Sequence, residues 1–404
     1  MTLPLVILKP KRDASIQRKH PWVFSGAIHK IILTEDEANL PEEGDLVQVL
    51  NAKEQFLGIG HWGESSIAVR LLSFEETTIN KAFFIEKFQS ALNLRKSLNL
   101  YKQDKTSCYR LVHAEGDSLP GLIIDIYNDV AVVQAHSRGM AMAFDAIAEA
   151  LKQVLNKEIN AIYSKSEQTL PKQYSSEFPD SYLWRSDKQI AQKTTVKENN
   201  LLFEIDWIEG QKTGFFIDQR ENRFALQKYV EGKSVLNTFC YSGGFSVYAL
   251  GANAKSVDSV DSSAKAIELC NRNVELNFPK VKNHRAIAQD TFSFLNESEE
   301  KYDVILLDPP AYAKSKSAKH NAIQGYRRLN EKALRMINSG GILFTFSCSQ
   351  IIHRKLFEDT ITAAAIDAGR SVRILEHLSQ PADHPVNIFH PEGEYLKGLV
   401  LFVE

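Results

Sequence analysis

The stretch KSVLNTFCYSGGFSVYALGANAKSVDSVD, residues 233–261, decides the fold of the C-terminal half of the chain. KSVLNTF is typical of a buried strand, the segment beginning FSVYALGA is typical of a helix, and AKSVDSVD is typical of a second strand. The alternation continues with strands at 284–290, 302–308, 340–348, 371–378 and 395–404, and helices at 264–277, 322–337 and 353–368. It predicts an α/β fold with a mostly parallel sheet covered on both faces, whose ligand sites lie outside the carboxyl ends of the strands.

The first half of the chain has a different pattern. Up to about residue 75 it contains short β segments, among them a hairpin made by 46–50 and 56–59 and a strand in SIAVRLLSF. Residues 76–200 combine helical periodicity at 80–98 and 140–155 with a hairpin that turns at Asn128-Asp129 and a loop at 167–180. We therefore predict three domains, which comprise residues 1–75, 76–200 and 201–404.

Composition limits the class of protein. The 404 residues are 44% hydrophobic and 24% charged, as in ordinary globular proteins, and the net charge of -2 gives no general attraction to nucleic acid. The four cysteines are scattered without a C-x-x-C pair, which argues against a disulfide framework and a structural zinc site, so we expect no metal. The N-terminus is apolar and then basic, the reverse of a signal peptide, and we expect a cytoplasmic protein.

The ends of the first three strands carry candidate cofactor residues. Gly243 and Gly244 allow a close approach of the backbone to a ligand, although a tight connection is an alternative explanation. Asp261 ends the second strand, where a carboxylate can accept hydrogen bonds from ribose hydroxyls, and Asp290 ends the third, where it could face an adenine amino group. Either aspartate could instead cap a helix. Because phosphate-binding glycine motifs are absent from the sequence, the ligand expected is an adenosine without pyrophosphate, and S-adenosylmethionine fits.

The fourth and fifth strands carry candidate reaction residues. LLDPPAY closes the fourth strand, and its two prolines fix the backbone after Asp308. The fifth strand ends TFSCSQ, so we expect Cys348 at the same edge of the sheet. A thiolate that adds to carbon-6 of a pyrimidine makes carbon-5 nucleophilic, and Asp308 would hold the base edge and share in proton transfer. The alternative for Cys348 is packing, which is how we interpret Cys240 and Cys270.

Two basic clusters are candidates for RNA contact. The first comprises Lys11, Arg12, Arg18 and Lys19, close in sequence to Trp22 and Phe24. A solvated basic arm, with Trp22 in a core, is the alternative. The second follows the Asp-Pro-Pro turn and includes Lys314 and Lys316, which could bind RNA phosphates or serve only solubility.

Several motifs, taken in order, resemble one family. They are YRLVHAEGDSLPGLIIDIYNDVAVVQ, GQKTGFFIDQRENR, NTFCYSGGFSVYA, DPPAYAKSK and SCSQ. Over nearly its whole length the chain resembles the bacterial large-subunit ribosomal RNA cytosine-carbon-5 methyltransferases. The resemblance implies an N-terminal β-rich PUA-like barrel that binds RNA, a small α+β central domain, and a C-terminal Rossmann-like class I methyltransferase sheet. It also implies a homodimer.

The resemblance also implies roles for individual residues. S-adenosylmethionine would bind through the turn from Tyr241 to Phe245, with Asp261 and Asp290 as adenosine contacts and Cys348 as the nucleophile. Residues near the cofactor or the substrate would be Asp218, Gln219, Arg220 and Asp308. The sequence departs from fold relatives in two places. Asn237 occupies a position that is often acidic, and Ala311 and Tyr312 stand where related enzymes carry a second cysteine for product release, so release requires another base.

Two other functions stay open from the sequence. An amino-directed methyltransferase often has an aromatic residue directly after its Asp-Pro-Pro motif, but Tyr312 comes one residue late and Cys348 would have no role. A non-catalytic RNA-binding or ribosome-assembly factor is disfavoured by the intact Asp261, Asp308 and Cys348.

Overall fold

The computed structural model describes residues 3–33, 39–186, 190, 192–313 and 316–404. The chain forms two compact units: Met1–Thr194 with Ile205–Phe215 and Ala382–Gly393, and Thr195–Glu204 with Phe216–Pro381 and Glu394–Glu404. The chain first passes from one unit to the other in the two-stranded sheet of β12 (Lys193–Glu198) and β13 (Leu201–Asp206). The predicted boundary after residue 200 falls inside this hairpin. The division into three domains itself stays a prediction.

The first unit begins with a six-stranded sheet in the order β2-β6-β5-β4-β1-β3. Its strands are β1 (Leu5–Leu8), β2 (Trp22–Phe24), β3 (Ile28–Ile32), β4 (Leu46–Leu50), β5 (Phe56–Trp62) and β6 (Ile67–Ser73), with the short helix α1 (Ala14–Gln17) before β2. Valines that alternate along β4, Val47 and Val49, point into its core. The predicted hairpin of β4 and β5 is confirmed by their antiparallel pairing.

The first unit also contains a five-stranded sheet in the order β11-β10-β9-β8-β7. Its strands are β7 (Cys108–His113), β8 (Leu122–Tyr127), β9 (Val130–Ala135), β10 (Ala161–Ser164) and β11 (Ser181–Arg185). Helices α2 (Lys81–Ser97) and α4 (Phe144–Leu155) pack together and contribute to the same core. The single helix predicted at 140–155 is wrong, because the chain breaks at Ala143 between α3 (Arg138–Met142) and α4. The predicted loop at 167–180 contains the short helix α5 (Lys172–Ser175).

The second unit contains a seven-stranded sheet in the order β16-β15-β14-β17-β18-β20-β19. Its strands are β14 (Ser234–Thr238), β15 (Ser256–Asp261), β16 (His284–Ala288), β17 (Tyr302–Leu307), β18 (Ile337–Ser347), β19 (Val372–Leu378) and β20 (Lys397–Val403). The pairs among β14 to β18 are parallel, whereas β20 runs antiparallel to both β18 and β19. The predicted, mostly parallel α/β sheet is therefore confirmed.

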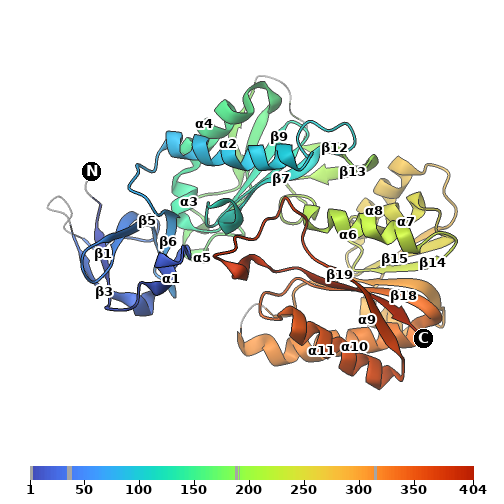
Figure 1. Cartoon of the computed structure of the whole chain (residues 1–404). Helices are drawn as coiled ribbons and strands as arrows, with labels where there is room; N and C mark the ends of the chain where they lie inside the picture. Colours follow the sequence, from blue (N-terminus) through green and yellow to red (C-terminus); the bar gives the residue numbers. More distant parts are fainter. Residues whose placement is uncertain (1–2, 34–38, 187–189, 191, 314–315) are drawn as a thin grey trace. The chain divides into compact units, whose positions relative to one another are not determined.

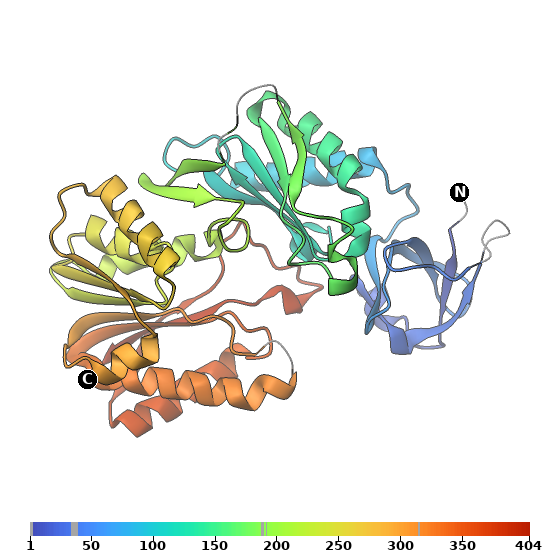
Figure 2. The same cartoon turned by 180° about the vertical axis from the view of Figure 1, so that it is seen from behind.

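Helices cover both faces of this sheet (Figures 1 and 2). One face carries α6 (Arg220–Leu226), α7 (Gly244–Gly251) and α8 (Ala264–Asn277), and the other carries α9 (Thr291–Glu297), α10 (Lys319–Met336) and α11 (Arg354–Ala368). Tyr326, Leu329 and Ala333 recur at helical spacing on α10 and are buried against the sheet. Within the residues described, no helix has the length and apolar character needed to cross a bilayer.

Candidate active site

Asp308 and Cys348 lie at the same edge of the seven-stranded sheet. Each directly follows the last residue of its strand, β17 or β18, and these two strands are parallel neighbours. Cys348 Sγ lies 3.9 Å from the carbonyl oxygen of Pro309. The other cysteines are buried and Cys348 is partly exposed, so it is the thiol that a ligand can reach.

The residues on either side of Cys348 are held by buried hydrogen bonds. Ser347 Oγ donates to the Tyr326 hydroxyl oxygen at 3.0 Å, and Ser349 Oγ donates to the Ala313 carbonyl at 2.8 Å. Ser347 and Ser349 are both buried. The backbone on both sides of the thiol is therefore fixed before any substrate arrives.

Asp308 is oriented by Gln219, which directly precedes α6, and Gln219 is in turn held by Asn222 on α6. Gln219 Nε2 donates to Asp308 Oδ2 at 3.0 Å, and Asn222 Nδ2 donates to Gln219 Oε1 at 2.6 Å. The second bond fixes the Gln219 amide so that its nitrogen faces the carboxylate. Part of Asp308 is exposed, but protein atoms enclose its carboxyl group. This enclosure, together with the negative charge of Asp218, raises the pKa of Asp308 to about 7. The group can therefore hold or release a proton near neutrality.

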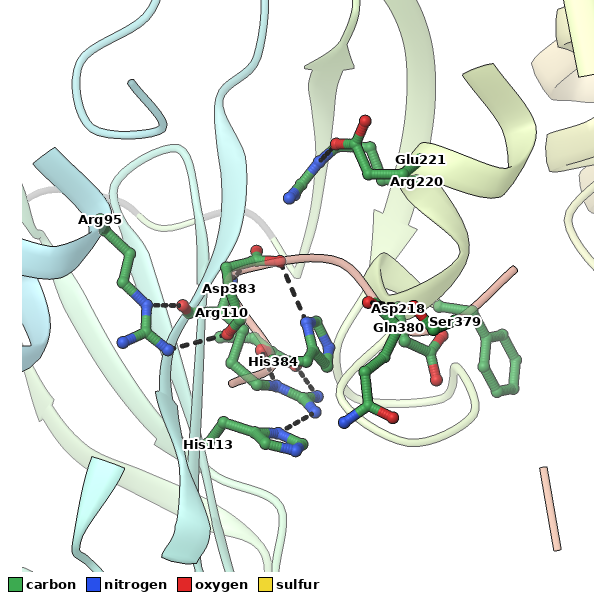
Figure 3. A network of polar contacts seen from close by, with 12 residues as sticks. Arg95, Arg110, His113, Asp218, Arg220, Glu221, Ser379, Gln380, Asp383 and His384 are labelled. Carbon is green, nitrogen blue, oxygen red and sulfur yellow. Dashed lines mark hydrogen bonds and ion pairs between the residues drawn. The ribbon is translucent and has the colours of Figure 1, made fainter. Parts of the chain in front are cut away.

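Asp218 and Arg220 lie beside Gln219, in the 3-10 turn Ile217–Gln219 and at the start of α6. The Tyr395 hydroxyl donates to Asp218 Oδ2 at 2.8 Å. Asp218 Oδ1 is buried and, among the residues that the structure describes, has no hydrogen-bond partner. Arg220 is buried, and its Nε donates to Glu221 Oε1 at 3.1 Å (Figure 3). The unsatisfied oxygen of Asp218 leaves an acceptor free for a ligand.

Packing against neighbouring side chains also requires glycine at positions 243 and 244. Gly243 has a φ of 72°, and a Cβ there would lie 2.5 Å from Cys270 Sγ. A Cβ at Gly244 would lie 2.9 Å from Arg223 Cδ. Arg223 is itself buried in a bidentate ion pair with Glu198, at 2.8 and 2.7 Å. The turn between β14 and α7 therefore needs both glycines with or without a ligand, as the tight-connection alternative requires.

Three residues predicted near the cofactor differ in how much of each can reach a ligand. Asp261 is partly exposed; its carboxylate accepts from Tyr241 N at 3.0 Å and Ser263 N at 2.9 Å and so fixes the glycine turn from the neighbouring strand. Asn237 is buried and donates to Ser246 Oγ at 2.8 Å. Phe245 is buried with its ring centroid 5.7 Å from that of Phe346. Only Asp261 among these three keeps polar atoms near the surface.

Asp290 was predicted to end the third strand, and this boundary is wrong by two residues. β16 ends at Ala288, and Asp290 is the N-cap of α9, with its carboxylate accepting from Ser293 N at 2.9 Å. The side chain is exposed. Asp290 is thus a helix cap, as the alternative interpretation proposed. Its carboxylate is exposed and can still accept hydrogen bonds from a ligand.

The N-terminal basic residues flank α1 in the sequence. Lys11, Arg12, Arg18 and Lys19 are all exposed, and Lys19 Nζ lies 4.8 Å from the centre of the Phe74 ring. Lys314 lies outside the described residues. Lys316 is the first residue of the 3-10 turn Lys316–Ala318, before α10.

The two aromatic residues close to this cluster differ in how much of each ring is exposed. Trp22 packs with its ring centroid 4.3 Å from that of His390 and donates its indole N–H to Glu115 at 2.9 Å, so its ring has structural contacts, although it is only partly buried. Phe24 is 46% exposed and remains available to a partner. Of this pair, Phe24 is the more exposed ring and the better candidate to stack on a base.

His20, His390 and Glu392 bring three potential metal ligands together in the first unit. The backbone N–H of Trp22 donates to His20 Nδ1 at 3.1 Å, which in a neutral ring leaves the proton on Nε2. Nε2 is the nitrogen that faces Glu392, at 3.5 Å. A protonated nitrogen has no lone pair for a metal ion, so we assign no metal role to this cluster.

A buried ionic network, which the sequence did not reveal, anchors residues 382–393 to the five-stranded sheet (Figure 3). Arg95 makes a bidentate ion pair with Asp117, at 2.5 and 2.8 Å, and donates to the Asp383 carbonyl at 2.8 Å. Asp383 Oδ2 accepts from Arg110 N at 3.0 Å, and Asp383 Oδ1 lies 3.1 Å from His384 Nδ1. Breaking one member would leave a buried charge without a partner, so this network has a structural role.

Four further residues of the site escaped the sequence analysis: Asn222, Tyr326, Tyr395 and Lys397. They act through contacts between residues far apart in the chain, as in the bond from Tyr395 to Asp218. For one of these four residues, Lys397, the sequence contains an indication of its importance. Lys397 interrupts the apolar run YLKGLVLFV, where a buried charge needs an explanation.

Comparisons with known proteins agree with this architecture. Residues 109–399 match the family model of S-adenosylmethionine-dependent methyltransferases, and residues 6–74 match the model of a PUA-like domain. The chain is 38% identical to the ribosomal RNA large subunit methyltransferase I of Photobacterium profundum, over 100% of both chains. It is 39% identical to the protein of that name from Aeromonas hydrophila, over 98% of each chain.

Solved structures show the same fold. A SAM-dependent methyltransferase from Streptococcus mutans aligns over 100% of both chains with a TM-score of 0.83 and 23% identity. A methyltransferase complexed with SAH aligns over the same extent with a TM-score of 0.84 and 23% identity. From the family match, the fold and the full-length relatives, the chain belongs to the S-adenosylmethionine-dependent methyltransferases with an N-terminal PUA-like domain, alongside the proteins named ribosomal RNA large subunit methyltransferase I, and its cofactor is S-adenosylmethionine.

Proposed function

We propose that this protein methylates carbon-5 of a cytosine in large-subunit ribosomal RNA, with Cys348 as the nucleophile. The observation that carries the proposal is the position of Cys348, the one partly exposed cysteine, at the same sheet edge as Asp308. The substrate class follows from the relatives, whose names identify them as large-subunit ribosomal RNA methyltransferases.

The residues at this edge fit a cofactor that carries an ammonium group and ribose hydroxyls. The buried Asp218 Oδ1 lacks a partner in the described structure and could accept from the ammonium group. Asp261 is partly exposed and could accept from the ribose hydroxyls, and the exposed Asp290 from the adenine amino group. The turn from Tyr241 to Phe245 would lie against the cofactor. When bound, S-adenosylmethionine supplies an electrophilic methyl group.

In the reaction, the Cys348 thiolate adds to carbon-6 of cytosine and forms a carbon–sulfur bond. The electron pair of the carbon-5 to carbon-6 double bond moves to carbon-5, which becomes the nucleophile for the methyl group. Loss of the carbon-5 proton then re-forms the double bond and expels the thiolate. A pKa of about 7 suits Asp308 to donate a hydrogen bond to the base when protonated and to accept the carbon-5 proton when ionised. Asp308 would thus supply the base that the sequence did not identify.

The amino-directed alternative is weakened by the position of Tyr312. Its ring centroid lies 4.7 Å from that of Tyr326, and its hydroxyl is buried. A ring packed in this way is poorly placed to stack on a target base, as the aromatic residue of amino-directed enzymes often does. The proposal for Cys348 has no corresponding conflict.

We further propose that RNA binds the exposed basic residues of the PUA-like domain, Lys11, Arg12, Arg18 and Lys19. Lys314 and Lys316, which follow the Asp-Pro-Pro turn, would contact phosphates near the target base. Cytoplasmic location and a homodimer complete the proposal.

The test is mass spectrometry of ribosomal RNA nucleosides from cells with and without the gene. We expect one 5-methylcytidine to disappear on deletion and to return with the wild-type protein, but not with Cys348→Ala. Loss of an N-methylated nucleoside that Cys348→Ala restores would instead establish the amino-directed reaction. No change in any nucleoside would favour the non-catalytic role.

A further inference from the structure

Lys397 is a buried lysine beside the strand end that carries Cys348. It is the first residue of β20 and pairs with Ser347, the last residue of β18, in the antiparallel register. Only 2% of its surface is exposed. Burying a lysine is costly unless its ammonium group is hydrogen-bonded, and the proposed reaction gives Lys397 no role so far.

The contacts of Lys397 connect it to the turn that holds Cys348. Its Nζ donates to the carbonyl oxygen of Ser349, the next residue after Cys348, at 2.6 Å, and to that of Tyr395 at 2.6 Å. Both partners are neutral carbonyls. Within the described part of the chain, no carboxylate forms an ion pair with Nζ, so its positive charge is not neutralised by direct contact.

We propose that Lys397 is a positioning residue for the nucleophile: it fixes the turn after Cys348 through the Ser349 carbonyl, and its buried positive charge stabilises the thiolate of Cys348. This inference rests on the proposed function of Cys348. It adds a residue that prepares the nucleophile before RNA or cofactor binds.

The surroundings of Lys397 are consistent with this role. Burial lowers the pKa of Lys397 to about 8, while interaction with Cys348 acts in the opposite direction. Lys397 therefore stays mostly protonated at pH 7. The other charged groups that act on it are Glu394 and Arg354, which pair with each other at 3.2 Å. Their mutual ion pair leaves Lys397 as the unpaired cation that acts on the thiolate.

Two further titratable groups act on Cys348 from other elements. Burial raises the pKa of Tyr326 on α10 to about 12, so its hydroxyl stays neutral. Asp308 follows the neighbouring strand β17 and becomes negative above about pH 7. A negative charge at this edge of the sheet would oppose the thiolate. Thiolate stabilisation by Lys397 should therefore be strongest below about pH 7 and weaken as Asp308 ionises and Lys397 loses its proton.

The test measures alkylation of Cys348 by iodoacetamide against pH in the full-length protein, with the modified peptide quantified by mass spectrometry. An unassisted cysteine has a pKa of about 8.5. We expect the wild-type rate to reach half its maximum at a clearly lower pH, and Lys397→Met to slow alkylation at pH 7 about tenfold, the effect of one pKa unit. Lys397→Arg, which keeps the charge, should recover much of the rate.

Lys165→Met is the matched control. Lys165 is also a buried lysine, and its Nζ donates to two backbone carbonyls, those of Ile208 and Gly210, but it belongs to the first unit. Its replacement removes the same kind of contact and should leave Cys348 alkylation unchanged. If Lys397→Met does not fold, the wild-type profile alone decides: a midpoint at or above pH 8.5 overturns the proposal.

Methyl transfer provides an independent readout. Loss of thiolate stabilisation predicts that Lys397→Met lowers kcat about tenfold at pH 7, with a gap that narrows as pH rises, and leaves the KM for RNA unchanged. An equal loss at every pH would mean a purely structural role. Because alkylation needs neither RNA nor cofactor, it tests Lys397 even if Cys348→Ala keeps methylation and the proposed function fails.

Discussion

The two halves of the sheet edge solve different physical problems. At the ends of β17 and β18, the proposed reaction residues Asp308 and Cys348 lie among amides, hydroxyls and carbonyls, the Lys397 ammonium group holds the turn after Cys348, and enclosure shifts the pKa of Asp308 to about 7. At the ends of β15 and β16, Asp261 and Asp290 are partly or fully exposed, and both carboxylates accept backbone N–H groups. The half proposed for the reaction therefore carries an energetic cost, whereas the half proposed for the cofactor stabilises its own turns.

The comparison predicts its largest effect at Cys348. Cys348→Ala should lower methyl transfer at least about a thousandfold, since Cys348 is the one partly exposed cysteine of the four and alanine cannot form the adduct. Binding of S-adenosylmethionine, measured by calorimetry, should stay within about twofold of wild type, because Cys348 belongs to the reaction half. If Cys348→Ala lost cofactor binding, Cys348 would also support the cofactor site, and the two halves of the edge would not have separate roles.

Asp308→Asn should lower methyl transfer and, separately, change how the stability of the protein depends on pH. We expect methyl transfer to fall about a hundredfold or more, because the amide cannot exchange a proton. A carboxyl whose pKa is raised in the folded state stabilises the protein below the unfolded pKa of about 3.9 and loses this stabilisation as pH rises through 7. Asp308→Asn has no titratable group at this position, so its stability should not fall for this reason as pH rises.

Thermal unfolding at pH 5 and pH 8 measures this effect. The wild type should lose stability between these values relative to Asp308→Asn, by on the order of 2 kcal/mol after allowance for its partial exposure. A gap between the two proteins that does not change with pH would mean that Asp308 is ionised throughout and has no role as a proton carrier.

In the cofactor half, Asp261→Ala should weaken S-adenosylmethionine binding about tenfold to a hundredfold, as expected for lost hydrogen bonds to a charged acceptor. It should also lower stability, because Tyr241 N and Ser263 N lose their acceptor. Calorimetry and thermal unfolding give the two values. Unchanged affinity together with lower stability would restrict Asp261 to fixing the turn.

We expect the smallest effect at Asp290. Two substitutions there distinguish its role as a helix cap from a contact with the cofactor. Asp290→Ala should cost about 1 kcal/mol of stability through loss of the α9 cap, whereas Asp290→Ser should retain the cap. If the carboxylate also contacts the cofactor, both variants should bind it severalfold more weakly. If Asp290→Ser binds S-adenosylmethionine with wild-type affinity, Asp290 acts only as the helix cap.

The sequence predicted those parts of the site that depend on strand ends. The apolar runs of β17 and β18 locate Asp308 and Cys348, because parallel neighbours end at the same edge. The α/β architecture followed from the same runs. The exact end of a strand was harder to predict: HRAIAQD continues to look extended past Ala288, so the strand was predicted two residues too long and the cap at Asp290 was only the alternative.

Contacts set by tertiary pairing could not be predicted from the sequence. Gln219 and Asp308 are 89 residues apart, and nothing local connects them. Lys397 meets Ser347 because the last strand inserts antiparallel between β18 and β19, an order that the alternating pattern does not encode. The break at Ala143 was hidden for a related reason, since continuous apolar sequence on both sides gives no local sign of it.

The most direct measurement of the central claim is to trap the adduct. A ribosomal RNA substrate with 5-fluorocytidine at the target cannot lose a proton from carbon-5, so the bond to the enzyme should persist after methyl transfer. With S-adenosylmethionine present, mass spectrometry of the digested complex should find the nucleotide on the peptide that contains Cys348. Methylation of ordinary RNA with no adduct to the fluorinated RNA, or an adduct at another residue, would contradict the account.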